Sequence, residues 1–424
     1  MRSFLDKIFF RSNNLDKISQ KIKDLTKKTP ANKIFKAIDS YSSSSQIRYV
    51  GGCIRKIIND EKIDDIDLAT NLNPEEICMA LKKNHLDYYE TGLEHGTITS
   101  IVDNYKFEIT SLREDVLTDG RHAKVKFSLD WRKDASRRDF TINSIYSDKD
   151  GNLFDPYDGK KDLEKGLIKF IGDANDRVKE DYLRILRYLR FFLSYSRRPH
   201  NPDIIKILKM NIEGVSGLSK DRLLDELKKI INLNSLEKLS KDKVSLSLIS
   251  IIFPELKNLN IFFKLSSRNR LILSKKDVIF LISLMIIDNT DNTDYFLYKY
   301  NLSKKDQKRL KIIDNFYKEK INKDLFSENN INKIFYYHGK QAVDDILTFG
   351  IVTYKKFDED LSKLINNFKE REVPVMPIGA STLMKKYQIP EGKQIGIMLK
   401  LIEQKWIEND FKISDQQINH IINN

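Results

Sequence analysis

Cysteine is scarce in this sequence, which has only Cys53 and Cys78 in 424 residues. Two cysteines cannot form the disulfide framework of a small secreted domain, and such scarcity is typical of a reducing compartment. Long apolar runs are also missing, because the longest, 278–287, has about half the length that a bilayer span needs. The N-terminal run MRSFLDKIFFRS carries charges and has no small-residue cleavage site, unlike a secretory signal. We therefore expect a cytoplasmic protein with no membrane segment.

Acidic residues are outnumbered, with 61 Asp and Glu against 74 Lys and Arg, which leaves a formal charge of +13. Such an excess favours polyanionic partners through phosphate contacts and counterion release. The abundance of Lys, Ile and Asn can also follow from an AT-rich genome, so charge alone leaves nucleic-acid binding open. The length predicts several compact units in a row.

The first part of the chain, up to about residue 150, alternates short β-branched runs with turns. Asp103 and Asn104 separate two of these runs, so we expect those two strands to pair antiparallel as a hairpin. The runs are 47–50, 66–69, 96–102 and 105–110. They predict an α/β unit with a small mixed sheet.

From about residue 180 onward, apolar residues recur at spacings of three and four, as in Leu183, Leu186 and Leu189, and β signals nearly vanish. This pattern predicts an all-helical remainder and therefore an α+β fold class. Loop-forming stretches interrupt the pattern at 199–202, 232–235, 254, 288–294 and 374–377.

Two adjacent glycines, Gly51 and Gly52, follow the run 48–50 and precede a short helical stretch that contains Arg55. A strand that leads through glycines into a helix lets the backbone approach a phosphate closely, and the arginine adds charge. The alternative is a turn that only reverses the chain.

Two carboxylates, Asp65 and Asp67, occupy positions i and i+2 of the next strand and project from the same face. Two like charges held this close need a cation between them, and Mg²⁺ commonly bridges carboxylates to substrate phosphates. Glu108 can face the pair from a neighbouring strand. The alternative, a solvated acidic pair at a strand end, does not account for three carboxylates on one sheet.

The motif at 137–143 combines Arg138 and Asp139, which could hold a ribose hydroxyl, with Asn143, which could brace the turn. A surface helix start with mixed charges is the alternative.

A further motif begins at Glu180, where the i, i+3 spacing of Asp181 and Arg184 places both on one helical face. Cytosine and adenine each present an amino donor beside a ring-nitrogen acceptor, whereas uracil and guanine present a carbonyl beside an N–H. A carboxylate and a guanidinium side by side would therefore accept C and A and reject U and G. The alternative is an ordinary exposed ion pair.

With these four motifs in this order, the sequence resembles the class II branch of tRNA nucleotidyltransferases and bacterial poly(A) polymerases. The resemblance runs from about Tyr49 to Ile231. It implies an N-terminal helix and nucleotidyltransferase head at 1–150, a neck at 151–235, a body at 236–325 and a tRNA-binding tail at 326–424, the last three helical. The stretches 377–380 and 392–406 resemble the tail of alphaproteobacterial members.

The resemblance also implies roles for the motif residues. Asp65 and Asp67 resemble the metal-binding pair, which would hold Mg²⁺, and Glu108 resembles the third acidic residue. The helix at 219–226 resembles the one that buttresses the nucleotide-selecting helix. The implied nucleotide-binding residues are Gly51, Gly52, Arg55, Arg138, Asp139, Asn143, Glu180, Asp181, Arg184 and Arg187.

The segment 113–134 resembles the flexible loop that accompanies the switch from C to A addition. CC-only enzymes have a shortened loop, whereas this segment has full length, which favours complete CCA addition. For His122 the alternative is a surface histidine without substrate contact. The candidate loop residues are Arg113, Asp119, Gly120, Arg121 and His122.

The sequence departs from the family pattern at Lys56, where an acidic or amide residue is usual. It also contains no His-Asp dyad, so we expect no fused metal-dependent phosphohydrolase domain.

The predicted function is the addition of C, C and A to the tRNA 3′ end from CTP and ATP without a nucleic-acid template. The tRNA 3′-hydroxyl would attack the α-phosphate, with magnesium stabilising both the entering and the leaving oxygens. Two alternatives stay open: an A-adding enzyme or poly(A) polymerase of the same family, and a tRNA-binding protein without catalysis.

Overall fold

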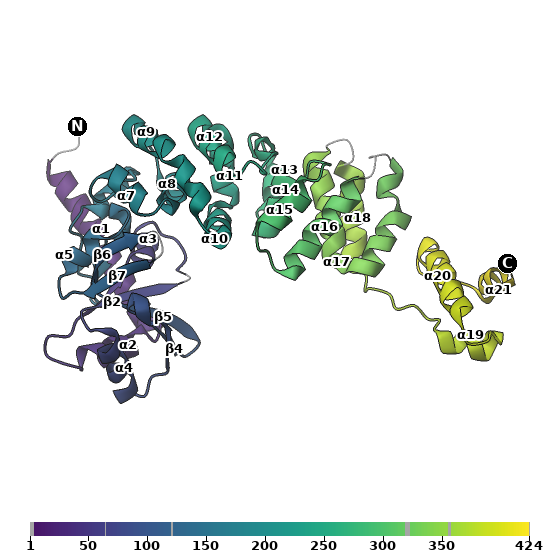
Figure 1. Ribbon diagram of the computed structural model, residues 1–424, viewed down its shortest axis with the longest axis horizontal. Coiled ribbons are helices and arrows are strands. Elements are labelled where there is room, and N and C mark those ends of the chain that lie inside the picture. The colour runs from purple at the N-terminus through teal and green to yellow at the C-terminus, as the bar shows by residue number, and fades with distance from the viewer. Residues whose placement is uncertain (1–3, 64, 120–121, 319–322, 355–357, 424) are drawn as a thin grey trace. The chain divides into compact units, whose positions relative to one another are not determined.

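The computed structural model describes residues 4–63, 65–119, 122–318, 323–354 and 358–423. The chain forms two compact units, Met1–Glu226 and Leu227–Asn424. All strands among the described residues belong to the first unit, and the elements of the second are helices (Figure 1). The predicted α+β class, a mixed-sheet head followed by helices, is confirmed.

The first unit is built on a mixed sheet with the strand order β3-β4-β5-β2-β1-β8-β9. Strands β2 and β5 pair in parallel, and the other described pairs are antiparallel. A separate hairpin pairs β6 with β7. The strands are β1 (Ile47–Val50), β2 (Ile66–Thr70), β3 (Tyr88–Gly92), β4 (Thr97–Val102), β5 (Tyr105–Ser111), β6 (Arg113–Asp119), β7 (His122–Phe127), β8 (Tyr146–Ser147) and β9 (Leu153–Phe154).

All four strands predicted from β-branched runs are present, as β1, β2, β4 and β5. The predicted hairpin is also confirmed, because β4 and β5 pair antiparallel with Val102 opposite Tyr105. Asp103 and Asn104 both adopt positive φ angles, of 49° and 66°. Two successive left-handed residues make the tight turn whose twist matches that of the flanking strands.

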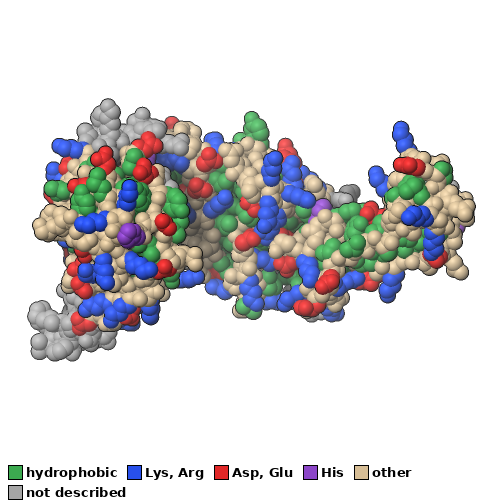
Figure 2. All heavy atoms as spheres, turned by 90° about the horizontal axis from the view of Figure 1, so that it is seen from below, with side chains coloured by type: hydrophobic (Ala, Val, Ile, Leu, Met, Phe, Trp, Pro, Cys, Tyr) green, Lys and Arg blue, Asp and Glu red, His purple; other side chains and the backbone are tan. Residues whose placement is uncertain are grey.

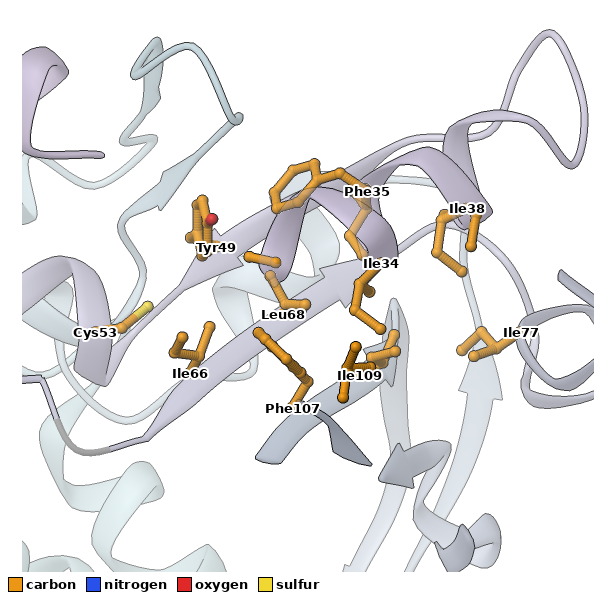
Figure 3. Packing of buried hydrophobic residues seen from close by; sticks show 14 of the residues in the cluster. Ile34, Phe35, Ile38, Tyr49, Cys53, Ile66, Leu68, Ile77, Phe107 and Ile109 are labelled. Atoms are coloured by element: carbon orange, nitrogen blue, oxygen red, sulfur yellow. The ribbon is translucent and has the colours of Figure 1, made fainter. Parts of the chain in front are cut away.

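The core of the first unit lies between one face of the large sheet and its helices. Figure 3 shows Ile34 and Phe35 of one helix packed over Leu68 and Ile109 of the central strands. The helices and 3₁₀ turns of this unit are α1 (Phe4–Lys28), α2 (Ala31–Asp39), α3 (Gly52–Ile58), α4 (Pro74–Lys83), η1 (Leu93–His95), α5 (Trp131–Ser136), η2 (Thr141–Asn143), α6 (Gly159–Lys165), α7 (Ala174–Glu180), α8 (Leu183–Tyr195), α9 (Pro202–Met210), η3 (Ile212–Gly217) and the greater part of α10 (Lys220–Ile230), which ends in the second unit.

The segment 113–134, predicted as a loop, is largely regular structure. It forms the hairpin β6–β7 and the start of α5. The dipeptide Asp119-Gly120 between the two runs is a recognised hairpin signal, but charged residues dilute the β pattern on both sides.

The second unit confirms the helical periodicity, and the predicted breaks at 254, 288–294 and 374–377 fall at or between helix ends. Other breaks, such as those after Lys241 and Leu273, were not predicted. Helix α14 contains most of the long apolar run and is buried from Ile279 to Ile286. No described helix is both long enough and apolar enough to cross a membrane. The elements are α11 (Leu233–Lys241), α12 (Lys243–Ile252), η4 (Leu259–Phe262), α13 (Ser267–Leu273), α14 (Val278–Ile286), α15 (Asn292–Lys299), α16 (Lys304–Lys318), η5 (Lys323–Phe326), α17 (Glu328–Thr353), α18 (Asp358–Lys369), α19 (Ala380–Tyr387), α20 (Lys393–Glu408) and α21 (Asp415–Asn423).

On the face drawn in Figure 2, Lys and Arg side chains lie among acidic ones and do not gather in one patch. On this face, charge alone therefore does not locate a binding site.

Candidate active site

Two acidic residues lie in register on neighbouring strands. β2 and β5 pair in parallel with Asp67 opposite Glu108, and residues paired in this way project from the same face of a sheet. Ile66 and Leu68 belong to the hydrophobic core, so Asp67 and Glu108 face away from it. Asp65 precedes the strand and is exposed. The sheet thus brings Asp67 and Glu108 to one face, whereas Asp65 lies just before β2 and not within the strand as expected.

The electrostatics of Asp67 are those of a carboxylate in need of a cation. Burial raises its pKa, and the negative charges of Glu108 and Asp65 raise it further, although Arg138 acts in the opposite direction. Glu108 forms an ion pair with Lys106 at 2.5 Å. Carboxylate oxygens are the donors that Mg²⁺ prefers.

Within the described residues, no three His, Cys, Asp or Glu side chains are grouped so that they could hold a metal together. A cation here would take its remaining ligands from water and substrate phosphates, which is usual for Mg²⁺.

The glycine pair brings backbone close to the acidic and basic side chains. Gly51 has a φ of 65°, which side chains rarely adopt, and a Cβ there would lie 3.5 Å from Arg138 Nη1. A Cβ at Gly52 would lie 3.6 Å from Asp67 Oδ2. In the next turn of α3, the buried Arg55 donates from Nη1 to Asn143 Oδ1.

The motif at 137–143 is held from both sides. Arg138 donates from Nε to Tyr146 Oη at 2.9 Å and from Nη2 to Asp134 Oδ2 at 3.1 Å. Asp134 is 1% exposed and also pairs with Arg137. These contacts fix the Arg138 guanidinium at the end of α5.

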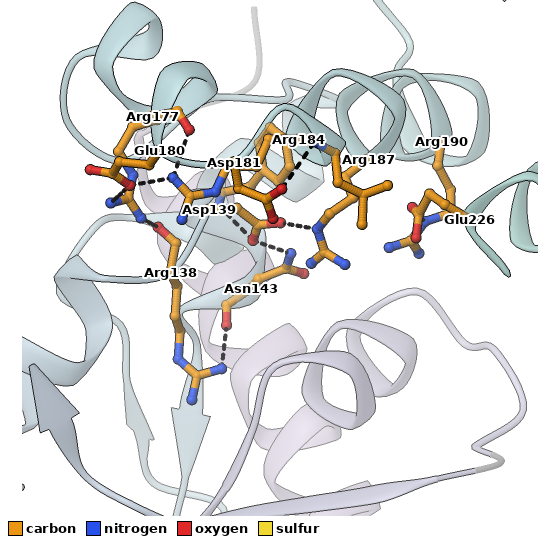
Figure 4. Close-up of polar contacts among 12 residues, drawn as sticks. Arg138, Asp139, Asn143, Arg177, Glu180, Asp181, Arg184, Arg187, Arg190 and Glu226 are labelled. Carbon is orange, nitrogen blue, oxygen red and sulfur yellow. Dashed lines mark hydrogen bonds and ion pairs between the residues drawn. The ribbon is translucent and has the colours of Figure 1, made fainter. Parts of the chain in front are cut away.

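Asp139 connects this motif to α8. Its Oδ1 accepts from Asn143 Nδ2 at 2.8 Å, and its Oδ2 accepts from Arg187 Nε at 2.6 Å (Figure 4). Burial opposes its ionisation, but the charge of Arg187 and the hydrogen bonds from Arg187 and Asn143 outweigh it and lower the pKa of Asp139 to about 2. Asn143 therefore braces the turn as predicted, because it joins Asp139 to Arg55.

Asp181 and Arg184 do not share one helix, contrary to prediction. Helix α7 ends at Glu180 and α8 begins at Leu183, and Asp181 between them has extended backbone angles. The carboxylate of Asp181 accepts from Leu183 N at 3.1 Å, which competes with continued helix at this point.

The two residues have separate partners. Arg184 Nη1 donates to Glu180 Oε2 at 2.5 Å, whereas Asp181 Oδ2 accepts from Arg222 Nη2 at 2.7 Å. The carboxylate and the guanidinium are therefore each held in place without neutralising each other.

Helix α10 supports α8 at two points four residues apart. Arg222 holds Asp181, and the buried Glu226 accepts from Arg190 Nε. These two contacts supply the support that was expected between the helix at 219–226 and the nucleotide-selecting segment.

Around Phe191, three guanidinium groups approach one ring. The distances from the ring centroid are 4.1 Å for Arg190, 4.7 Å for Arg55 and 5.6 Å for Arg187. Such contacts offset part of the cost of bringing like charges together.

One cleft of about 470 Å³ joins most of these groups. Its lining holds seven arginines and three aspartates, so it favours an anionic ligand. The lining residues are Gly51, Gly52, Arg55, Asp67, Arg137, Arg138, Asp139, Asn143, Asp181, Leu183, Arg184, Arg187, Arg190, Phe191 and Arg222.

Some predicted residues are not in this lining. Asp65, Glu108 and Glu180 lie beside it, the last behind Arg184. Arg113 is at the base of hairpin β6–β7, where its backbone N–H donates to Asp134 at 3.4 Å. Gly120 and Arg121 lie outside the described residues, as do the side chains of Asp119 and His122.

The residues to which the sequence assigned no role include Arg190 and Phe191 of the cleft lining, and Arg177, whose guanidinium donates to Glu180. Arg184, Arg187 and Arg190 follow one another at intervals of three residues, so they share one face of a helix. This spacing could have identified Arg190 from the sequence. Nothing in the local pattern distinguishes Arg177 or Phe191.

Comparisons with known proteins agree on one family. Residues 47–169 match the model of the Poly A polymerase head domain. The chain is 32% identical to human CCA tRNA nucleotidyltransferase 1, mitochondrial, over 88% of its own length and 85% of the relative's. It is 30% identical to the CCA-adding enzyme of Staphylococcus haemolyticus over 76% and 77% of the two chains.

A solved structure shares the fold over nearly the whole chain. It is the CCA-adding enzyme of Bacillus stearothermophilus in complex with CTP, with a TM-score of 0.68 at 18% identity, covering 92% of this chain and 95% of the other. By these relationships the chain belongs to the class II CCA-adding enzyme family of tRNA nucleotidyltransferases.

Proposed function

We propose that this protein adds C, C and A to the 3′ end of tRNA, taking CTP and ATP as substrates. Its relatives are named for CCA addition, and one solved relative is described with CTP. The observation that carries the proposal is the single cleft in which Asp67, the glycine pair and the arginines of α8 meet. A nucleoside triphosphate needs these groups in one place.

In this proposal Asp65 and Asp67 hold Mg²⁺ and Glu108 is the third acidic residue. A divalent ion at such a site stabilises the charge that develops on the attacking and leaving oxygens. The protein's own part is positioning: Gly51 and Gly52 admit the triphosphate to the backbone, and Arg55, Arg187 and the other cleft arginines offset its charge.

Base selection is assigned to Asp181 and Arg184. Asp181 would accept from the amino group of C or A, and Arg184 would donate to the ring nitrogen. Their separate partners, Arg222 and Glu180, support this assignment, because each group is fixed before the base arrives. Arg138 and Asp139 would orient the ribose.

The hairpin β6–β7 is proposed to take part in the change from C to A addition. By resemblance, the full-length segment favours complete CCA addition over a CC-only reaction. Arg113 at the start of β6 and His122 at the start of β7 would act as part of this hairpin. The human relative is named as mitochondrial, so the cytoplasmic location stays a prediction.

The test uses two tRNA substrates, one ending at the discriminator base and one ending in CC, each with a single NTP. We expect CTP to extend the first by two nucleotides and ATP to extend the second by one. Repeated A addition would instead indicate a poly(A) polymerase, and A addition without C addition an A-adding enzyme. Absence of any incorporation would leave only a tRNA-binding role.

A further inference from the structure

Arg177 is a mostly buried arginine behind the cleft, with its side chain 12% exposed. Its guanidinium reaches across from α7 to the motif at 137–143. Nη2 donates to the backbone carbonyls of Arg137 and Arg138 at 2.5 and 2.7 Å, and Nη1 donates to Glu180 Oε2 at 2.6 Å (Figure 4). One side chain thus ties together the backbone of one motif and a carboxylate of the other.

The same end of α7 holds Arg184. Nη1 of Arg184 donates to Glu180 Oε2 at 2.5 Å and to the backbone carbonyl of Arg177 at 2.7 Å. Because α7 ends at Glu180, the carbonyl of Arg177 is among the last four of the helix and lacks an intrahelical N–H partner. The guanidinium of Arg184 is therefore anchored to the terminal turn of α7, on the carboxylate oxygen that Arg177 also contacts.

We propose that Arg177 is a positioning residue for base selection, which sets the place of the Arg184 guanidinium relative to the loop of Arg138 and Asp139. This inference rests on the proposed function. The loop would hold the ribose and Arg184 the base of the same nucleotide, so their separation must match that of ribose and base. Arg177 is the side chain that contacts the loop backbone, Glu180 and, through Glu180, Arg184.

The contacts require arginine and not merely a positive charge. Two nitrogens of one planar guanidinium serve acceptors on opposite sides, two carbonyls and one carboxylate. A lysine ammonium is a single point and cannot span these acceptors with the same geometry. The variant Arg177→Lys therefore keeps the charge and removes the bridge.

The alternative is a purely structural role, in which Arg177 holds α7 on the head without affecting the nucleotide. That role predicts a loss of stability, or an equal loss of incorporation for all four NTPs. A positioning role predicts a change in the ratio between correct and incorrect bases, because a misplaced Arg184 no longer meets the ring nitrogen of C or A.

The experiment compares wild type with Arg177→Lys and Arg177→Gln. Lys179→Gln is the matched control, because Lys179 is an exposed cation on the same helix. Single-nucleotide kcat and KM are measured for CTP, ATP, UTP and GTP on tRNA lacking CCA and on tRNA ending in CC. Thermal melting and tRNA affinity are measured in parallel.

For Arg177→Lys we expect kcat/KM with the correct nucleotide to fall about 10- to 100-fold, mostly through kcat, because a small displacement from the reactive geometry is costly. The preference for CTP over UTP should fall about tenfold or more, while tRNA affinity changes less than about twofold. Arg177→Gln should show the same change in preference, and Lys179→Gln should match wild type.

Unchanged base preference in a folded Arg177→Lys enzyme would overturn the inference, and so would a uniform loss with all four NTPs. If both Arg177 variants fail to fold, the residue serves stability and the inference fails as well. If wild type itself does not add C and A, the proposed function fails first, so the two failures are distinguishable.

Discussion

At the scale of single residues, the aspartates at the start of β2 carry the most demanding part of the proposed chemistry. Asp67 is partly buried, close to Asp65 in sequence and in register with Glu108, so the protein alone compensates its charge poorly. A ligand that supplies two positive charges would reverse this imbalance.

We predict that Asp67→Ala and Asp65→Ala abolish nucleotide incorporation and leave tRNA affinity within a few-fold of wild type. Loss of one carboxylate leaves the cation poorly held, which costs several kcal/mol in transition-state stabilisation. Incorporation assays and a tRNA binding titration provide the measurement. Glu94→Ala, which removes an exposed acid of the same unit, is the control, and near-normal turnover in an aspartate variant would remove that residue from the mechanism.

Asp181→Ala should lower fidelity more than total activity. The correct base loses one hydrogen bond worth about 1–3 kcal/mol, whereas the repulsion that excludes U and G disappears. Single-nucleotide incorporation with all four NTPs measures the effect. A folded, active variant that still adds only C and then A would place selection elsewhere, and the segment 113–134 would be the next candidate.

Asp139 should make acid stability measurably dependent on its ion pair with Arg187. Its pKa is lowered from 3.8 to about 2, so its stabilising contribution is complete above pH 3.8 and is lost as the pH falls toward 2. The contribution at neutral pH is about 2 kcal/mol.

The difference in unfolding free energy between wild type and Asp139→Asn tests this. It should shrink between about pH 4 and pH 2. A difference that stays constant over this range would show that Asp139 does not titrate as its contacts imply.

The sequence indicated which residues belong to the site, but not which residues they contact through hydrogen bonds and ion pairs. The i, i+3 spacing predicted that Asp181 meets Arg184, whereas Asp181 pairs with Arg222, which lies 41 positions away. Contacts of this kind depend on how α10 packs on α8, and no local pattern encodes that packing.

At the scale of elements, α10 acts on the site through α8. Its residues Arg222 and Glu226 stand one helical turn apart and engage Asp181 and Arg190. The carboxylate of Glu226 is 2% exposed and pairs with Arg190. Burial lowers the pKa of Arg190, and the positive charge of Arg187 lowers it further, whereas the negative charge of Glu226 raises it.

We predict that Glu226→Ala lowers the free energy of unfolding by about 3 kcal/mol, because it leaves the largely buried guanidinium of Arg190 without its counter-charge. Urea denaturation measures the loss. Glu226→Gln should cost less, since the amide still accepts a hydrogen bond, and Glu213→Ala, at an exposed acid of the same unit, should change stability by less than about 1 kcal/mol. Equal stability of Glu226→Ala and wild type would show that Arg190 finds another partner.

Local signals predicted some elements and failed for others. The hairpin β4–β5 was predictable because Asp103 and Asn104 tolerate left-handed angles between two β-branched runs. The break between α7 and α8 was not, because Glu180-Asp181-Tyr182 contains neither glycine nor proline and the apolar spacing continues beyond it. The side chain of Asp181, bonded to Leu183 N, ends the helix instead.

At the scale of the whole molecule, charge is the property that bears on RNA. The chain carries a formal charge of +13, and basic side chains are distributed over the face of Figure 2 without one dominant patch. We therefore expect tRNA to be recognised by shape and by many phosphate contacts.

The dissociation constant for tRNA should rise steeply with salt, on the order of 100-fold between about 50 and 200 mM, because each phosphate contact releases counterions. A binding titration at several salt concentrations measures the slope, with thermal melting over the same range to exclude unfolding. A dissociation constant that does not respond to salt would contradict recognition through phosphates.

The arginine-rich lining of the cleft links the stability of the fold to the concentration of nucleoside triphosphate around the protein. Without a triphosphate the seven arginines lie close to one another, and six of them rely on ion pairs with Asp134, Asp139, Glu180, Asp181 and Glu226 to limit their mutual repulsion. A ligand that binds only the folded state adds stability in proportion to the logarithm of its concentration, about 2.7 kcal/mol at about 100 times its dissociation constant. A high triphosphate concentration would thus protect this fold against unfolding and proteolysis. A fall in that concentration would shorten the lifetime of the protein before it lowers the rate of catalysis.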